Sequence, residues 1–84
     1  MEHSSGQLYG SIQTAKKVGI SIRQLYHWVD TLEVVNPKLW QFGLRQFRRF
    51  TPEDLKTLGR VKELLERGYT LRAAVEIVKG QRIP

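Results

Sequence analysis

The stretch GISIRQLYHW, residues 19–28, carries polar side chains that form hydrogen bonds in close succession, namely Arg23, Gln24, Tyr26 and His27. Arg can hold the edge of guanine and Gln the edge of adenine through paired hydrogen bonds, whereas Tyr and His can bind phosphate. This set therefore offers recognition of nucleic acid. The alternative is an ordinary solvated helix face, because amphipathic helices have polar outer faces.

A second group of charged side chains follows in residues 36–50. This segment contains four basic residues and no acidic one, the basic residues being Lys38, Arg45, Arg48 and Arg49. The whole chain of 84 residues has 14 Lys and Arg against 8 Asp and Glu, so the segment holds most of the net charge of +6. Such charge favours a polyanionic partner, either nucleic acid or an acidic membrane surface. Flexible cations beside a helix would neutralise phosphates and release counterions.

Other chemistries find little support in the residues. Ser21, His27 and Asp30 superficially offer a nucleophile, a base and an orienting group, but a helix cap explains Ser21 and no segment of so short a chain forms a cleft. We therefore expect no enzyme. Cysteine is absent, and His3 and His27 alone cannot build a metal site, so we expect neither metal nor cofactor.

No apolar run is long enough to span a bilayer, and the first residues lack the hydrophobic core of a signal peptide. We therefore expect a cytoplasmic, nucleoid-associated protein with no membrane partner.

Two short helices are predicted to position the polar side chains of residues 23–27. Ser11 is expected to cap the first, whose apolar positions are Ile12, Ala15 and Val18 and which ends at Gly19. The second helix is predicted over residues 21–33.

Ser21 and Gln24 form a capping-box pattern at the start of this second helix. Its expected buried stripe is Leu25, Trp28, Val29 and Leu32. A rotation of about 100° per residue then places Arg23, His27 and Asp30 on the outer face, with Gln24 and Tyr26 beside it. Asp30 would repel phosphate, so we expect it to lie off the DNA backbone or to orient a neighbouring base.

The basic segment is predicted to be a β-hairpin over residues 38–41 and 45–49, because it is aromatic, follows Asn36-Pro37 and contains Gly43. Its tip is expected near Phe42-Gly43. Trp40 and Phe47 are expected to use one hairpin face to seal the small core. The alternative is that these rings stack on bases, as in proteins that bind single strands.

Two further helices complete the pattern. Thr51, Pro52 and Asp54 form a strong helix start, and Phe50 is expected to staple onto Leu55. The inner face of this third helix is predicted as Leu55, Leu58, Val61 and Leu65, and the helix is predicted to end at Gly68.

Thr70 is expected to cap the last helix, which closes at Gly80 and buries Leu71, Ala74, Val75 and Val78. Three apolar residues lie outside the buried stripes of these two helices, namely Leu64, Ala73 and Ile77. They belong either to a loosely packed part of the core or to a patch for a partner helix.

The order of helix, tight turn, helix, hairpin and two helices predicts a mainly α fold with a small β-hairpin, a winged helix-turn-helix. We expect a flexible tail over residues 1–8, one domain over residues 9–80 and a C-terminal end at residues 81–84.

The chain resembles the DNA-binding domain of the mercury-resistance regulator (MerR) family in three stretches. These are AKKVGISIRQLYHW (15–28), FRRFTPEDLKTL (47–58) and VKELLERGYTLRAAVEIV (61–78). The resemblance implies a transcriptional regulator that binds double-stranded DNA, with the helix at residues 21–33 in the major groove and the wing at 38–49 on phosphates. It also implies a second wing at the junction formed by Arg67, Gly68 and Tyr69.

Family members normally act as homodimers on inverted repeats through a long C-terminal helix that this sequence does not contain, and we expect no small-molecule effector. The residues expected to contact DNA are Lys16, Ser21, Arg23, Gln24, Tyr26, His27, Lys38, Arg45, Arg48, Arg49, Arg67 and Tyr69.

Two other functions fit the same fold. One is an accessory protein of phages or mobile elements, of the excisionase or terminase small subunit type. The other is a chromosome-anchoring protein with low sequence preference. The arrangement of binding sites separates them from a regulator.

Overall fold

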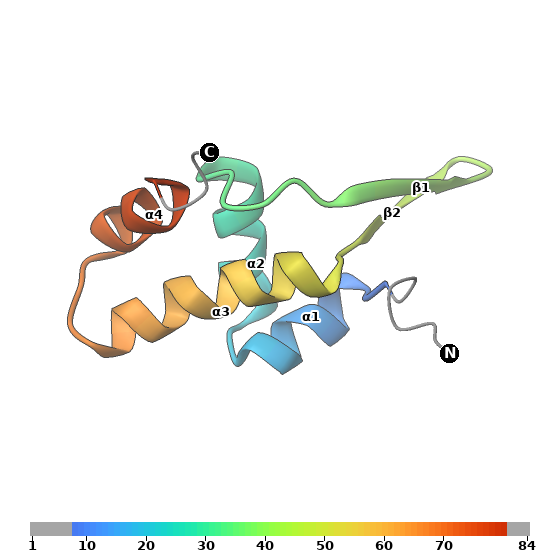
Figure 1. The fold of residues 1–84 in the computed structure, drawn as a ribbon. Helices are drawn as coiled ribbons and strands as arrows, with labels where there is room; N and C mark the ends of the chain where they lie inside the picture. Colours follow the sequence, from blue (N-terminus) through green and yellow to red (C-terminus); the bar gives the residue numbers. More distant parts are fainter. Residues whose placement is uncertain (1–7, 81–84) are drawn as a thin grey trace, which may run out of the picture.

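The computed structural model describes residues 8–80. Along the chain it contains helices α1 (Ser11–Val18), α2 (Ile22–Tyr26) and η2 (His27–Thr31), strands β1 (Lys38–Phe42) and β2 (Arg45–Arg49), and helices α3 (Pro52–Glu66) and α4 (Leu71–Gly80). The helices form one body from which the hairpin projects (Figure 1). This confirms the mainly α fold with a small hairpin. The predicted tail, apart from Leu8, and residues 81–84 lie outside the described part.

Helix α1 begins one residue earlier than the sequence predicts. Gly10 occupies the N-cap position and makes no side-chain capping bond, so the predicted cap at Ser11 is wrong. The chain is fixed just before this point, because Tyr9 and Phe50 exchange two backbone hydrogen bonds of 2.8 and 2.7 Å. Ile12 is 67% exposed, whereas Thr14 is buried beside Ala15, so the apolar pattern of this helix predicted its inner face only in part.

The turn after α1 requires a left-handed residue, which Gly19 supplies with φ of 88°. Its N–H donates to the carbonyl of Ala15 at 2.8 Å, and Ile20 donates to the same oxygen at 3.0 Å. These bonds close the last turn of α1 and direct the chain into the second helix, as predicted.

The second helix starts as predicted but changes its geometry half-way. Ser21 and Gln24 form the complete capping box, and Leu25 and Trp28 are buried. From His27 onward the helix widens to π geometry, in which Leu32 N–H donates to the carbonyl of His27 at 3.1 Å. The α-helix predicted to residue 33 is therefore wrong in its second half.

The end of this helix carries a strained residue. Glu33 has φ of 54°, a left-handed conformation that non-glycine residues seldom adopt. Next to it, Val34 N–H donates to the carbonyl of Trp28 at 3.0 Å and its side chain is fully buried. The chain thus reverses at Glu33 so that Val34 returns to the core. Residues 22–31, α2 followed by η2, are called the second helix below.

Helix α3 is the centre of the hydrophobic core. Thr51 and Asp54 form a second capping box, as predicted, and Phe50 is fully buried. Leu58 and Val61 are buried as expected. Leu64, predicted to lie off the stripe, is also buried, with 3% exposed.

Helix α4 covers the C-terminal half of α3. The Oγ1 atom of Thr70 accepts from Ala73 N–H at 3.1 Å, which confirms the cap. Ala74, Val75 and Val78 are buried, and Ile77 packs against the core at partial exposure. Ile77 is thus peripheral core.

The hairpin does not join the core. Within the described chain, no buried hydrophobic residue lies between residues 36 and 49. Trp40 is 43% exposed, and Phe47 is half-buried against Phe42, with ring centroids 5.8 Å apart, so the prediction that Trp40 and Phe47 seal the core is wrong. The physical reason is the absence of a second layer, since the two-stranded sheet extends away from the helices (Figure 1).

The hairpin turn lies one residue beyond the predicted tip. The strands pair in register from Lys38↔Arg49 to Phe42↔Arg45, which leaves Gly43 and Leu44 as the two turn residues. Gly43 has φ of 61° and Leu44 does not have a positive φ, the pattern of a type II′ turn with glycine first.

Candidate nucleic-acid interface

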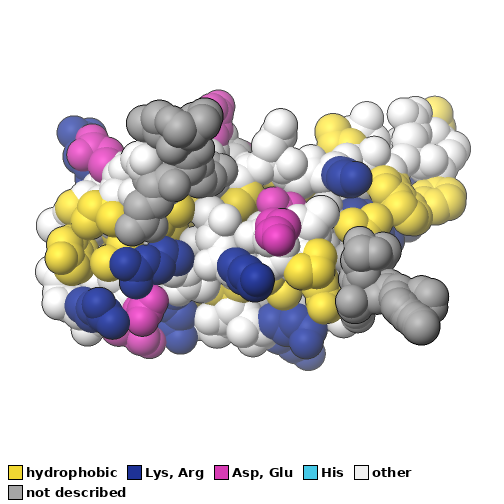
Figure 2. Space-filling view, viewed as in Figure 1, with side chains coloured by type: hydrophobic (Ala, Val, Ile, Leu, Met, Phe, Trp, Pro, Cys, Tyr) yellow, Lys and Arg dark blue, Asp and Glu magenta, His cyan; other side chains and the backbone are white. Residues whose placement is uncertain are grey.

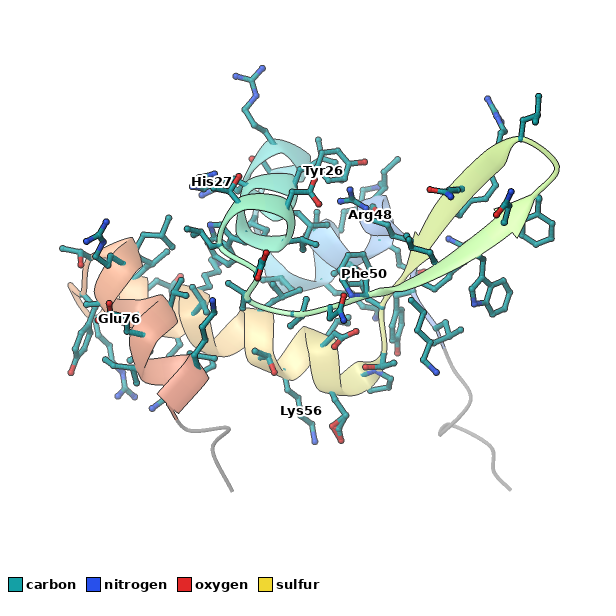
Figure 3. All side chains as sticks on the ribbon, turned by 90° about the horizontal axis from the view of Figure 1, so that it is seen from above. Tyr26, His27, Arg48, Phe50, Lys56 and Glu76 are labelled. Atoms are coloured by element: carbon teal, nitrogen blue, oxygen red, sulfur yellow. The ribbon has the colours of Figure 1, made fainter. Side chains whose placement is uncertain are left out.

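The outer face of the second helix presents its polar side chains to solvent. Arg23, Tyr26 and His27 are all exposed, and Tyr26 and His27 project from different sides of this helix (Figure 3). Gln24 is exposed too, but its Oε1 atom accepts from Ser21 N–H at 3.0 Å. The capping box therefore occupies the acceptor of Gln24, and its amide nitrogen remains for a partner.

Arg48 joins the hairpin to this helix. Its Nη2 atom lies 2.9 and 3.0 Å from the two carboxylate oxygens of Asp30. Its guanidinium carbon also lies 5.1 Å from the centroid of the Tyr26 ring, and the two side chains face each other at the base of the hairpin (Figure 3). This charge pair and the cation–π contact orient the base of the hairpin relative to the helix.

A hollow opens where these elements meet. It lies between the start of α1, the second helix and strand β2, and Arg48 with Asp30 forms part of its wall. The full lining consists of Gly10, Ser11, Ile12, Gln13, Tyr26, Asp30, Gln46, Phe47, Arg48 and Arg49. The Nη1 atom of Arg48 is buried and has no hydrogen-bond partner among the described residues.

The other hairpin cations lie on the opposite face of the sheet. Cross-strand partners share a face, so Lys38, Arg45 and Arg49 lie on one side and Arg48 on the other. The Arg49 guanidinium lies 5.8 Å from the Trp40 ring and 5.6 Å from the Phe47 ring. The basic residues predicted as one group therefore divide into one that contacts the second helix and three that do not.

The predicted second wing lies at the far end of the molecule from the hairpin, at the junction of α3 and α4 (Figure 1). Tyr69 is 46% exposed there. Arg67 pairs with Glu63 at 3.2 Å. A hydrogen bond from Arg60, together with the charge of Arg67, lowers the pKa of Glu63 below its usual range. Part of the charge of Arg67 is thus balanced within α3.

Lys16, on α1, is exposed. Its neighbour Lys17 lies over the Tyr9 ring, with 5.4 Å between Nζ and the ring centroid.

The contact between Asp30 and Arg48 is the feature that sequence reasoning missed. The helical periodicity placed Asp30 on the outer face, and the alternation along β2 separates Arg48 from Arg49. Neither pattern fixes the direction in which a hairpin leaves its neighbouring helix, and this direction brings the two side chains together.

No helix within residues 8–80 is long and apolar enough to cross a membrane. No group of three or more His, Asp or Glu side chains in the same range is placed to hold a metal ion.

The comparisons with known proteins agree with this geometry. Residues 10–81 match the model of the MerR HTH family of regulatory proteins. The chain is a member of the MerR family. The resemblance inferred from the three sequence stretches is thereby confirmed, and no curated protein sequence matches the chain significantly.

Two solved MerR family structures share the fold. HiNmlR, described as a MerR family regulator lacking the sensor domain and bound to promoter DNA, is 25% identical with a TM-score of 0.73. The similarity covers 89% of this chain and 55% of HiNmlR. A MerR family transcriptional regulator from Bacillus cereus is 18% identical with a TM-score of 0.76, covering 93% of this chain and 56% of that protein. The chain thus spans just over half the length of either relative.

Proposed function

We propose that this MerR family chain binds double-stranded DNA in a sequence-specific manner and regulates transcription. The observation that carries the proposal is an exposed row of hydrogen-bonding side chains on a helix that is tied, through Asp30 and Arg48, to a basic hairpin. Family membership and the promoter complex of HiNmlR support it.

In this proposal the second helix lies in the major groove. A helix fits that groove, and the N-terminal residues of a recognition helix lie nearest the bases. Arg23 is exposed one residue after the start of α2, so it is the strongest candidate for a base contact. Gln24 has only its amide nitrogen to offer, which can donate to a base acceptor. Tyr26 and His27 would contact phosphate.

The hairpin would hold the flanking backbone. Lys38, Arg45 and Arg49 would neutralise phosphates, and each neutralised phosphate would add to the salt dependence of binding. Arg48 differs because it is already paired with Asp30, so its contact with phosphate would be weaker or shared. The further contacts proposed on family grounds are Ser21 at the start of the second helix, Lys16 on α1, and Arg67 and Tyr69 at the junction of α3 and α4.

Selection of bound duplexes from a random pool, at about 150 mM salt, tests this function directly, because nonspecific phosphate binding is weakened at that concentration. We expect an enriched motif arranged as an inverted repeat, which indicates a homodimer on two half-sites. Tandem direct repeats would instead indicate an accessory protein of the excisionase type. Salt-sensitive binding without any enriched motif would contradict sequence-specific regulation and favour an architectural or anchoring role.

A further inference from the structure

The hairpin exposes apolar side chains that the proposed phosphate contacts do not use. Phe42 and Leu44 are 58 and 102% exposed, and Trp40, on the same face of the hairpin as Phe42, is 43% exposed. Hydrophobic and basic side chains appear together over this end of the molecule (Figure 2). A cluster of large exposed apolar side chains usually marks a surface that binds something.

The geometry of the hairpin presents this surface in a defined way. The turn at Gly43 and Leu44 leaves the Leu44 side chain at the outermost point of the arm. Behind it, Phe42 is held by Phe47 at 5.8 Å and by Trp40 at 6.4 Å between ring centroids. Aromatic pairs at such distances stabilise one another, so the tip is an ordered apolar projection.

Charge decides which partner this tip fits. Residues 34–52 contain no Asp or Glu, and Lys38, Arg45 and Arg49 share one face with the rings of Trp40, Phe42 and Phe47. Two such hairpins would repel each other, which disfavours a second copy of the chain as the occupant. A polyanion that also offers apolar surfaces between its charges fits the arm, and stacked bases flanked by phosphates have this combination.

We infer that the tip is a wedge, in which Phe42 and Leu44 insert between neighbouring base pairs and kink the duplex. Proteins that kink DNA insert apolar side chains such as Phe and Leu between base steps from the minor groove. The inference rests on the proposed DNA binding and adds deformation of the duplex to it. Arg45, the cross-strand partner of Phe42, would hold a phosphate beside the opened step.

The reach of the arm agrees with this role. Each strand has five residues, and five residues of antiparallel strand span about 17 Å. Half a turn of B-DNA, the separation between the major groove and the next minor groove along one side, is also about 17 Å. With the second helix in the major groove, the tip can therefore reach the adjacent minor groove.

The test uses the duplex recovered by selection, and the same duplex with one mismatched pair moved along it position by position. A mismatch lowers the energy needed to open the stack, so a wedge binds tighter where the mismatch lies under it. We expect the affinity, measured by fluorescence anisotropy, to rise about tenfold at a position roughly half a turn from the Arg23 contact. Energy transfer between dyes on the two duplex ends should report the kink.

Leu44→Ser and Phe42→Ser should abolish the mismatch preference and the kink while binding to the paired duplex persists. Gln46→Ser is a matched control on the opposite hairpin face and should change neither. Circular dichroism checks that each variant folds, which is expected because both tip side chains are more than half exposed.

A wild-type protein without mismatch preference, or tip variants that keep it, would overturn the wedge. So would sedimentation showing that Leu44→Ser converts a dimer to a monomer, or flotation showing that the tip binds anionic vesicles instead of DNA. A wild-type protein that binds no duplex at all is a different result, because it refutes DNA binding itself.

Discussion

The two tryptophans of this chain mark two regions with different physical demands. Trp28 belongs to the second helix and is 1% exposed, packed in the core with Leu25 and Val34. Trp40 belongs to the hairpin and is 43% exposed, with the Arg49 guanidinium 5.8 Å from its ring. The helix is thus held by the core of the whole domain, whereas the hairpin is held by its own strand pairing and by Arg48. A rigid helix suits contacts with the bases. A hairpin held only by local contacts suits a DNA backbone whose shape varies.

The largest expected difference between the two regions is in stability. Trp28→Ala should lower the free energy of unfolding by about 3–5 kcal/mol, because it removes a buried aromatic ring from a small core. Trp40→Ala is the matched control and should change it by less than about 1 kcal/mol. Urea denaturation followed by circular dichroism measures both.

Should Trp28→Ala prevent folding altogether, Trp28→Phe supplies a milder variant for the same comparison. Equal losses at Trp28 and Trp40 would show that the hairpin belongs to the cooperative core.

A second pair of substitutions separates global from local stabilisation. Ser21→Ala removes the capping box of the second helix and should cost about 0.5–2 kcal/mol of unfolding free energy. Gly43→Ala forces a side chain into positive φ at the hairpin turn, at a local cost of about 1–2 kcal/mol. We expect Gly43→Ala to loosen the hairpin, seen as faster amide hydrogen exchange over residues 38–49, with an unchanged urea midpoint. A shift of the midpoint as large as that of Ser21→Ala would contradict this separation.

The contact between the two regions should have a smaller effect. Asp30→Asn removes the ion pair with Arg48, and a partly exposed pair of this kind contributes about 0.2–1 kcal/mol. The substitution also releases Arg48 to neutralise a phosphate, so affinity for all duplexes should rise and the salt slope should steepen by about one. Titrations by anisotropy at several salt concentrations measure this. A fall in affinity would instead show that Asp30 orients Arg48 for its DNA contact.

The smallest effect is expected at the junction of α3 and α4. Because Arg60 and Arg67 lower the pKa of Glu63, the charged carboxylate stabilises the fold. This stabilisation is present above the ordinary carboxyl pKa and is lost as pH falls through the lowered pKa. Glu63→Gln should therefore remove a shallow acid-dependent decrease in melting temperature, and the mutant and wild-type curves should converge at low pH. Parallel curves would refute the assignment.

Features that depend on residues close together in the chain were predicted from the sequence. Caps at Ser21, Thr51 and Thr70 were predicted correctly, because a capping bond depends on residues only a few positions apart. Buried residues such as Leu25 and Leu58 were predicted because helix periodicity identifies a face that must pack.

The failures have an equally physical origin. Trp40 was expected in the core because large rings are usually buried, but burial needs a covering layer, and local sequence cannot show that the hairpin extends away from the helices. The π turn beginning at His27 and the pair of Asp30 with Arg48 likewise depend on how distant segments meet. Among the candidate contacts, the sequence predicted residue types and exposure but not which cation was already paired.

The central claim is that the second helix reads bases while the hairpin holds the backbone. Affinities of Arg23→Ala and Arg45→Ala for the selected duplex and a scrambled duplex, measured across a range of salt concentrations, test it most directly. We expect Arg23→Ala to lose about 1–3 kcal/mol on the selected duplex and to relax specificity, while Arg45→Ala weakens both duplexes similarly and flattens the salt slope. If Arg23→Ala left affinity and preference unchanged, the second helix would not be the element that reads DNA.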